Sequence, residues 1–387
     1  MKDSSLLIKN GNIYTITGGI LKEHDMLIEK GKIVDIRNNI LGEYPTIDAR
    51  GLNVLPGFIE AHCHIGIEEP SGVNSGNLNE TSSPITPYIR GIDGVNFSDP
   101  SFKRALENGV TTVSTGPGSG NVIGGTSCIL KTYGKTPYDI IVREKHSMKA
   151  ALGENPKRIH GLKGRCPITK MGIAHLLRDS LRKTKIYSLK KAVNSKGKEY
   201  NEIDITLEEL VPVVEGDMPL SIHVHRVDDI FTALRIGEEF NLRVNLLHVT
   251  EGIELSDKIK QQGYSAVIGP IMSFSKKQET HNKSNYTVKE FIDKGILTSI
   301  TTDHPVTPIE YLGISAGLCV RYGLSYIDAL KSITINPAKI LGIDKKVGSL
   351  EIGKDADIQI IDGTPLEVMS RVLYVVGNGK IVYKALS

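Results

Sequence analysis

Two histidines, His62 and His64, stand where a long apolar run of strand type, residues 54–61, comes to its end. Because side chains alternate across a strand, both imidazoles would project to the same side while Cys63 points to the other. Two neutral imidazoles that converge from one strand end supply half of a metal site, and zinc is its usual occupant. A His-x-His pair alone is a weak signal, so a metal site requires further ligands elsewhere in the chain.

Such ligands follow three other predicted strands. His223 and His225 come at the end of one strand, His248 ends a second, and Asp303 ends a third. Barrels of parallel strands place the residues at the carboxyl ends of their strands around one mouth. The chain has only 11 histidines, and the ends of four separate strands carry His or Asp. This set indicates a metal site.

The elements that must position these residues alternate between strand and helix from residue 55 to residue 345. Such alternation predicts an α/β fold with a parallel sheet and covering helices. A segment of roughly 290 residues has about the typical size of a (β/α)₈ barrel of the TIM type. A doubly wound open sheet is the alternative, but we find no glycine-rich fingerprint after the first strand.

The two ends of the chain are composed of short strands and turns. Residues 1–54 contain Asn10-Gly11, a strong hairpin signal, and residues 346–387 repeat the strand–turn–strand pattern. Each arm is too small to build a core by itself, and chain termini often lie close together. We therefore predict one small, discontinuous β-sandwich domain from 1–54 and 346–387, with the barrel at 55–345. Two separate β appendages are the alternative.

Composition excludes several classes of protein. The 387 residues carry a net charge of +3 with scattered basic residues, so nothing indicates nucleic acid or a membrane surface as a partner. No run approaches the 18 apolar residues of a membrane span, and residues 1–5 lack a signal-peptide pattern. The four cysteines form no Cys-x-x-Cys pair. We expect a cytoplasmic homo-oligomer that acts on a small molecule.

Two motifs resemble those of the amidohydrolase superfamily. Residues 56–64, Pro-Gly-Phe-Ile-Glu-Ala-His-Cys-His, are similar to its Pro-Gly-Phe-Ile-Asp-x-His-x-His signature. Residues 348–357, Gly-Ser-Leu-Glu-Ile-Gly-Lys-Asp-Ala-Asp, resemble its return strand into the small β domain. The likeness covers the whole chain and is greatest to imidazolonepropionase-like and prolidase-like members. It implies one or two divalent metal ions, with zinc expected, that activate water against an amide, ester or related bond.

Roles follow from this resemblance by position. His62 and His64 would hold the more buried metal, and Asp303 would complete its shell and act as the catalytic base and proton shuttle. His223 and His248 would hold the second metal. A two-metal site holds the hydroxide between its ions, and Asp303 then passes the proton to the departing nitrogen.

Members with two metals also need a bridging anion from the fourth strand. Lys149 lies in an apolar strand, where its charge is costly, and carboxylation would turn it into that anion. Glu154, just past the strand, is the alternative, and without either bridge the site holds one metal. His225 shares a face with His223, so geometry alone does not choose between them. The family position favours His223 as ligand and His225 as a substrate contact.

Two loops supply the remaining substrate-binding candidates. The long loop at residues 66–90, rich in Gly, Ser, Asn and Pro, contains Glu80 and Arg90, and long loops in compact domains tend to be functional. Arg90 could bind a substrate carboxylate, although a structural ion pair is an equal alternative. The glycine-rich segment 116–127 contains Asn121 and misses a phosphate loop because Thr126 replaces the lysine.

The sequence therefore predicts a metal-dependent amidohydrolase that cleaves a C–N bond other than an ordinary peptide bond. An amide, a cyclic amide or an N-acyl amino acid or dipeptide would be the substrate. Hydrolysis of a lactone or organophosphate ester in the same site is one alternative. A non-catalytic barrel scaffold is another, although such proteins typically lack several ligands. No Gly-x-Ser-x-Gly elbow supports a serine hydrolase.

Overall fold

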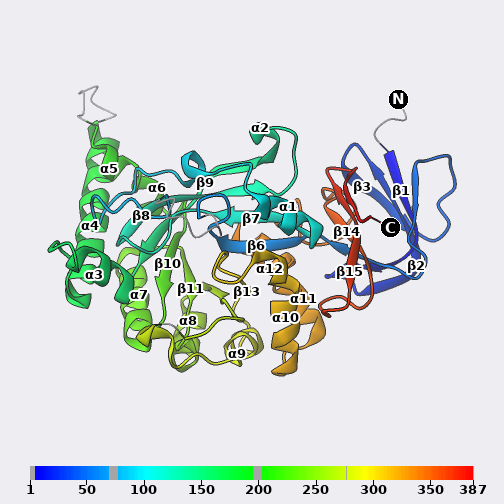
Figure 1. Ribbon diagram of the computed structural model, residues 1–387. Coiled ribbons are helices and arrows are strands. Elements are labelled where there is room, and N and C mark those ends of the chain that lie inside the picture. The colour runs from blue at the N-terminus through cyan, green and yellow to red at the C-terminus, as the bar shows by residue number, and fades with distance from the viewer. Residues whose placement is uncertain (1–4, 69–76, 195–202, 276, 387) are drawn as a thin grey trace.

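The computed structural model describes residues 5–68, 77–194, 203–275 and 277–386, and two eight-stranded sheets organise them (Figure 1). One sheet curves into a nearly closed barrel. The other is built from both ends of the chain and lies beside the barrel, with the two termini on its side of the molecule. The fold is therefore mixed α/β.

The barrel sheet runs in the order β13-β12-β11-β10-β9-β8-β7-β6. Its strands are β6 Phe58–Cys63, β7 Val110–Thr115, β8 Ile123–Lys131, β9 Ile141–Ala151, β10 Leu220–Val224, β11 Val244–His248, β12 Ser265–Ile268 and β13 Thr298–Ile300. Side chains connect the two edge strands. The Thr301 hydroxyl donates to the His62 carbonyl at 2.5 Å, and the buried Glu60 carboxylate accepts from Thr302 N at 2.8 Å. These bonds hold the end of β6 against the end of β13.

One strand departs from the regular (β/α)₈ pattern predicted from the sequence. β8 runs antiparallel to both of its neighbours, while the other adjacent pairs in this sheet are parallel. No helix lies between β7 and β8, because the glycine-rich segment 116–121 turns the chain directly back. Glycine is a poor helix former, so this segment does not form a crossover helix. It forms the turn of an antiparallel hairpin instead. The expectation of strand–helix alternation is wrong at this place.

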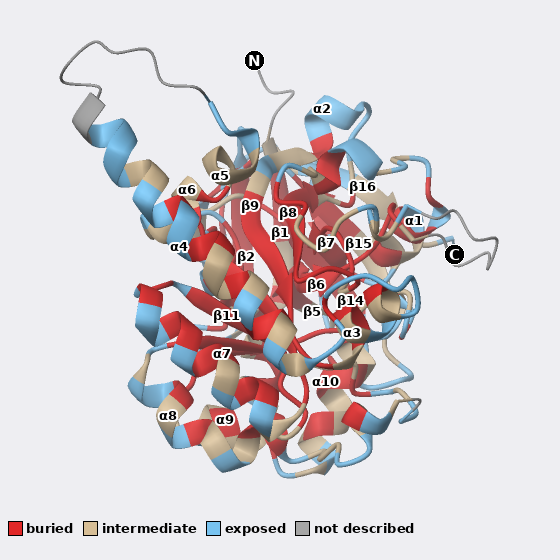
Figure 2. Cartoon of the chain, turned by 90° about the vertical axis from the view of Figure 1, so that its left-hand side faces the viewer, coloured by how far each residue is buried: buried red, intermediate tan, exposed pale blue. Residues whose placement is uncertain are grey.

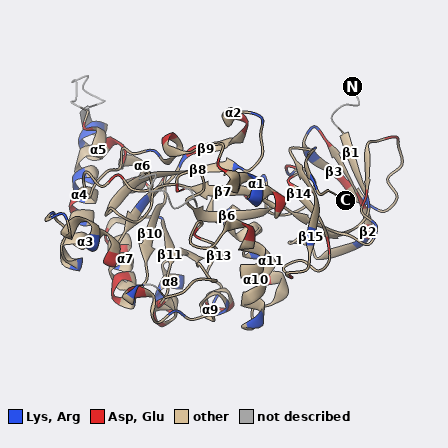
Figure 3. Ribbon diagram, viewed as in Figure 1, with Lys and Arg blue, Asp and Glu red and all other residues tan. Residues whose placement is uncertain are grey.

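Helices cover the outside of the barrel, with buried residues facing the strands and exposed residues facing solvent (Figure 2). They are α1 Pro100–Glu107, α3 Glu154–Gly161, α4 Lys170–Asn194, α7 Val227–Phe240, α8 Ser256–Gln261, α9 Thr287–Asp293, α10 Leu312–Arg321, α11 Tyr326–Lys331 and α12 Ile335–Ile340, with the single turns α2 Pro137–Ile140, α5 Ile205–Glu208 and α6 Val211–Val214. In the described part of the chain, no helix combines the length and the hydropathy that crossing a bilayer requires. Basic and acidic residues are interspersed along the ribbon (Figure 3).

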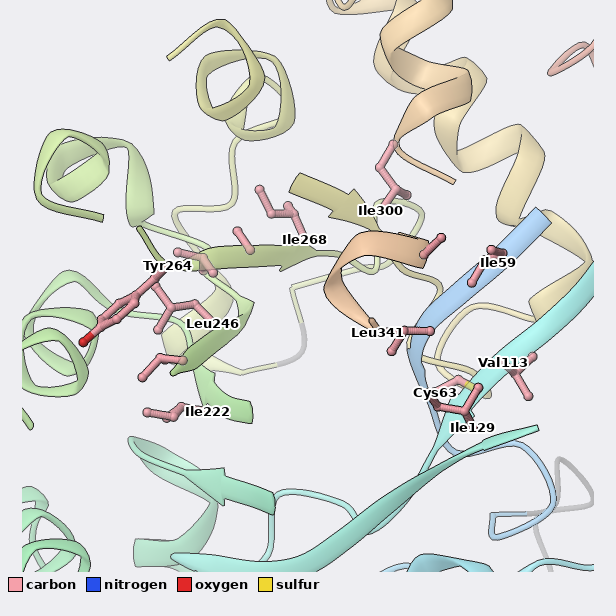
Figure 4. Close-up of a cluster of buried hydrophobic side chains, with 14 of the residues drawn as sticks. Ile59, Cys63, Val113, Ile129, Ile222, Leu246, Tyr264, Ile268, Ile300 and Leu341 are labelled. Atoms are coloured by element: carbon pink, nitrogen blue, oxygen red, sulfur yellow. The ribbon is translucent and has the colours of Figure 1, made fainter. Parts of the chain in front are cut away.

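The alternation of side chains along β6 separates the apolar core from the polar interior. Ile59 and Cys63 are fully buried in the main hydrophobic cluster, together with residues of the other barrel strands such as Val113 and Ile222 (Figure 4). Cys63 Sγ donates to the carbonyl of Ser114. Ala61 and His62 both face the barrel interior, because the register of β6 against β7 shifts between Glu60 and Cys63, so strict alternation is broken at this end of the strand.

The second sheet joins the two ends of the chain, as the sequence predicted. Its order is β16-β15-β14-β5-β1-β2-β3, and β4 pairs with β1. The strands are β1 Ser5–Tyr14, β2 Ile20–Glu29, β3 Lys32–Arg37, β4 Thr46–Asp48, β5 Asn53–Pro56, β14 Ile358–Asp362, β15 Arg371–Gly377 and β16 Lys380–Lys384. β5 connects the ends, parallel to β1 and antiparallel to β14. All eight strands belong to one hydrogen-bonded sheet that encloses its own apolar cluster; the predicted domain limits stay a prediction.

The predicted turn at Asn10-Gly11 is wrong. Both residues lie inside β1, at an irregularity in its pairing with β2. Asn10 has a φ of +59°, and its N–H donates to the Asp25 carboxylate at 2.9 Å instead of to the neighbouring strand. A Cβ at Gly11 would lie 2.6 Å from a methyl carbon of Val54. The Asn-Gly pair therefore forms a β-bulge inside the strand. A bulge, like a hairpin turn, favours residues that tolerate a left-handed backbone or that lack a side chain.

Asp357 connects the two sheets and carries a stability prediction. Its buried carboxylate pairs with Lys131 at the end of β8 and accepts from the Tyr133 hydroxyl at 2.5 Å. Asp357→Asn would leave the Lys131 charge without its partner, so we expect a loss of about 3 kcal/mol in the free energy of unfolding. Urea denaturation measures it. The control Glu107→Gln breaks an exposed pair with Lys103 and should cost less than about 1 kcal/mol; equal costs would contradict the prediction.

Candidate metal centre

Five buried imidazoles meet at the carboxyl ends of the barrel strands. They come from β6, β10 and β11, and Asp303 reaches them from the end of β13. Ring centroids lie 5.1 Å apart for His62 and His64, 4.6 Å for His223 and His225, and 4.5 Å for His223 and His248. Residues separated by up to 241 positions in the sequence thus form one polar cluster.

Asp303 anchors the first part of the cluster. Its Oδ1 lies 3.4 Å from His62 Nε2 and 3.5 Å from His64 Nε2, and His248 offers a third ring nitrogen within 4.8 Å of His62 and Asp303. Two ligand atoms on one tetrahedral zinc ion are about 3.4 Å apart, given bond lengths of about 2.1 Å. The spacing therefore matches that of atoms around a single ion.

Hydrogen bonds to backbone carbonyls fix the tautomers of two rings. Nδ1 of His64 lies 2.8 Å from the Gly116 carbonyl, and Nδ1 of His248 lies 2.7 Å from the Gly269 carbonyl. A carbonyl only accepts, so Nδ1 carries the proton and Nε2 keeps its lone pair. His225 Nδ1 lies 2.7 Å from the Thr250 hydroxyl, which orients the ring and can either accept or donate a proton. Partners of this kind orient metal-ligating histidines and raise their basicity.

Burial also keeps the rings neutral. It lowers the pKa of His62 to about 3 and that of His225 to about 4, and it holds the pKa values of His223 and His248 well below the ordinary value. Burial alone would raise the pKa of Asp303, but the neighbouring imidazoles, above all His248, hold it well below its usual range. A divalent metal requires neutral imidazoles and an ionised carboxylate, and its own positive charge would keep Asp303 ionised once the imidazoles are neutral.

Two of these residues have unusual backbone conformations. His248 has a φ of +73° and Asp303 a φ of +51°, in the left-handed region that side-chain-bearing residues rarely adopt. Asp303 N donates to Thr301 Oγ1 at 2.9 Å, which stabilises this turn. Strained conformations of this kind cluster at functional sites.

Lys149 is the cation of the cluster. It is 1% exposed, and its Nζ lies 3.3 Å from His62 Nε2. Burial lowers its pKa to about 8. Glu154, the other candidate for a bridge, begins helix α3 and is half-buried. The geometry thus places Lys149 against the imidazoles, and the bridging role stays a prediction.

Sequence reasoning missed Glu279, which belongs to the turn Gln278–Thr280 after β12. It is 2% exposed, and its Oε1 lies 3.8 Å from His223 Nε2 and 3.9 Å from His225 Nε2. Its neighbours in the sequence, Lys277 and Gln278, are polar, so the segment resembles an exposed loop. Only its position after a barrel strand could have indicated a role in the site.

The other substrate-binding candidates have structural partners. The exposed Glu80 carboxylate accepts from Ser82 N at 3.1 Å. Arg90 pairs with Glu144 at 2.5 Å, as the structural alternative had it. Asn121 is buried and donates to the Glu80 carbonyl at 2.6 Å while it accepts from a His160 ring nitrogen. Their contact with a substrate stays a prediction, and residues 69–76 of the first loop lie outside the described residues.

The residues of the cluster fit divalent metal ions. Five buried imidazoles and two carboxylates offer ligand atoms of the types that zinc prefers. They form two groups whose atoms lie within 4.8 Å of one another, namely His62, His248 and Asp303, and His223, His225 and Glu279. The buried Glu279 Oε1 has no hydrogen-bond partner among the described residues, an unfavourable state that a cation would relieve.

A nearly closed barrel with histidines and an aspartate at its mouth is the architecture of metal-dependent hydrolases, and the comparisons with known proteins agree. The sequence profile of the amidohydrolase family matches residues 53–383, so the chain belongs to that family. An amidohydrolase from Thermotoga maritima is 37% identical in its solved structure, with a TM-score of 0.95 over 98% of this chain and 100% of that one.

Two curated relatives are similar over most of this chain. The amidohydrolase tasK of Hapsidospora irregularis is 28% identical over 83% of it, although the match spans only 35% of that longer protein. The imidazolonepropionase of Picrophilus torridus is 27% identical over 94% of this chain and 86% of its own. These relatives identify the chain as a hydrolase of the amidohydrolase family.

Proposed function

We propose that the protein is a metal-dependent amidohydrolase that cleaves a C–N bond in a cyclic amide, an N-acyl amino acid or a related amide. The observation that carries the proposal is the cluster of five buried imidazoles around Asp303 at the barrel mouth. A bound divalent ion, zinc in our proposal, would supply an activated water and polarise the carbonyl of the substrate.

Asp303 supplies the proton transfer. It is held ionised, and its Oδ1 lies within 3.5 Å of the two imidazoles of β6. A carboxylate in this position can accept the proton of the attacking water and return it to the leaving nitrogen. The ring of His225 lies 5.0 Å from that of His248, and its Nδ1 is 2.7 Å from the Thr250 hydroxyl.

Lys149 supplies the bridging anion in this proposal. Its neutral amine would attack carbon dioxide to form an N-carboxylate, with release of one proton, and this exchanges a buried positive charge for a negative one. Burial favours the neutral amine that this reaction needs. His62 lies 3.3 Å away, so the new carboxylate would form among the imidazoles.

A cleft of about 670 Å³ opens beside the cluster and supports a small substrate. Its lining includes the cationic side chains of Lys157, Arg158, Lys170 and Arg226 and the carboxylates of Glu154, Asp228 and Glu279. Asp228 pairs with Lys170 and Arg226, which leaves Lys157 and Arg158 as the cations without a partner from this lining. Cations at this position could bind the carboxylate of an N-acyl amino acid or dipeptide. The similarity to imidazolonepropionase supports a cyclic amide as the substrate instead. Both substrate classes should therefore be tested in one activity screen.

Metal-loaded protein should hydrolyse at least one substrate among N-acyl amino acids, dipeptides and cyclic ureides. Removal of the metal with a chelator should lower the rate by at least about 100-fold, and zinc or manganese should restore it, because water activation depends on the ion. Ammonia or amine release measures the rate. Turnover of lactones or organophosphates alone would favour ester hydrolysis, and less than about 0.3 metal per chain after loading would indicate a scaffold.

A further inference from the structure

Lys283 is a half-buried lysine whose ammonium group is surrounded by uncharged oxygens. Its Nζ donates to the carbonyls of Pro270 at 2.5 Å and Ile271 at 2.6 Å, and the hydroxyl and carbonyl of Ser273 lie 3.2 and 3.4 Å away. An ammonium has three protons to donate, so these four oxygens can accept all of them. Burial lowers the pKa of Lys283 to about 8, and the group therefore still carries its charge at pH 7.

The four oxygens belong to the segment that follows β12. Lys283 stands 10 to 13 residues further along the chain, so its ammonium closes this part of the loop back on itself. Burial of an ammonium is costly unless polar atoms surround it. The carbonyls of Pro270 and Ile271 meet that need only while both point at Nζ, so the contact fixes the directions of two consecutive peptide groups.

The peptide group before these two holds a histidine of the cluster. The Gly269 carbonyl lies 2.7 Å from His248 Nδ1, from which it accepts. The ring of Pro270 fixes its φ, and the peptide bond between Gly269 and Pro270 is planar. The ψ angle of Pro270 is therefore the single soft torsion between the carbonyl that His248 contacts and the carbonyl that Lys283 binds.

We propose that Lys283 is a positioning residue that holds the His248 ring in the direction that metal binding requires. It acts through the carbonyls of Pro270 and Gly269 and does not touch the cluster itself. Partners on the far nitrogen of a metal-ligating histidine orient the ring and raise its basicity, and Lys283 fixes such a partner. The inference rests on the proposed function, because His248 is a metal ligand there.

Zinc affinity and rescue by an added amine test this role without reference to activity. Lys283→Ala should raise the Kd for zinc by at least about 10-fold, as loss of a group that orients a ligand does; competition with a chromophoric chelator measures it. The variant leaves a space lined by oxygens, so ethylammonium should restore the affinity, whereas tetramethylammonium, which has no N–H, should not. Lys283→Met keeps most of the apolar stem and should show the same loss without rescue.

A matched variant and a double variant separate positioning from ordinary loop stability. Lys260 Nζ also donates to a loop carbonyl, that of Gly295 at 2.6 Å, but this loop precedes β13, so Lys260→Ala should retain the wild-type Kd. His248→Asn should weaken zinc binding by itself. Because Lys283 acts through that ring, Lys283→Ala should then raise the Kd by less than about twofold more.

Three results would overturn the inference. They are costs of Lys283→Ala and His248→Asn that add, a Lys283→Ala protein that melts at a lower temperature but binds zinc as the wild type does, and affinity that tetramethylammonium restores as well as ethylammonium. A wild type that shows the expected dependence on Lys283 but hydrolyses no substrate of any class would instead overturn the proposed function.

Discussion

Asp303→Asn should lower turnover by at least about 100-fold while metal binding is largely retained. Asparagine preserves the shape of the side chain and one oxygen, but it cannot accept a proton, so the general-base contribution is lost. The turn that positions the residue depends on the backbone bond from Asp303 N to Thr301 Oγ1, which the substitution leaves in place. The rate constant kcat at saturating zinc measures the effect.

Two controls make this result specific. Metal analysis of the same preparation separates loss of the base from loss of the ion, and Asp293→Asn changes an exposed aspartate that pairs with Lys289 on α9. The control should retain the wild-type rate. A metal-loaded Asp303→Asn protein with near-normal kcat would remove Asp303 from proton transfer.

Much of the site could be predicted because it depends on local rules. Alternation along β6 places His62 and His64 on one face, and the strand-end rule for barrels groups them with His248 and Asp303. Lys149 could be identified because a lysine in an apolar strand needs a special environment. Each of these signals depends on only a few residues, so it can be recognised in a single sequence.

The features that escaped prediction depend on contacts that are distant in the sequence. Glu279 is buried only because its loop folds back against His223, and nothing in its polar neighbourhood indicates burial. An ion pair of Arg90 was one of two predicted roles, but its partner Glu144 could not be named, because it lies across the hairpin strand β8, whose antiparallel direction was not foreseen. Asn10-Gly11 fits a hairpin as well as a bulge, and the approach of Val54 decides between them.

Lys149→Met should lower kcat by at least about 100-fold and remove the bridge between the proposed ions. Methionine fills the apolar part of the position, so the packing of β9 should persist, but it offers no nitrogen to carboxylate. A site that has lost its bridging anion retains less negative charge to hold two cations, and the two-metal chemistry depends on both. Hydrolysis at saturating zinc and bicarbonate measures the loss.

A direct spectroscopic signature accompanies the kinetic one. Wild-type protein equilibrated with ¹³C-bicarbonate and zinc should give a carbamate resonance that is absent from Lys149→Met. Lys145→Met provides the matched control, because Lys145 lies on the same strand but pairs with Glu209 at the protein surface, and this variant should retain both the resonance and the rate. If the wild type showed no carbamate, or if Lys149→Met kept its rate, the anion among these imidazoles would have to come from a different residue.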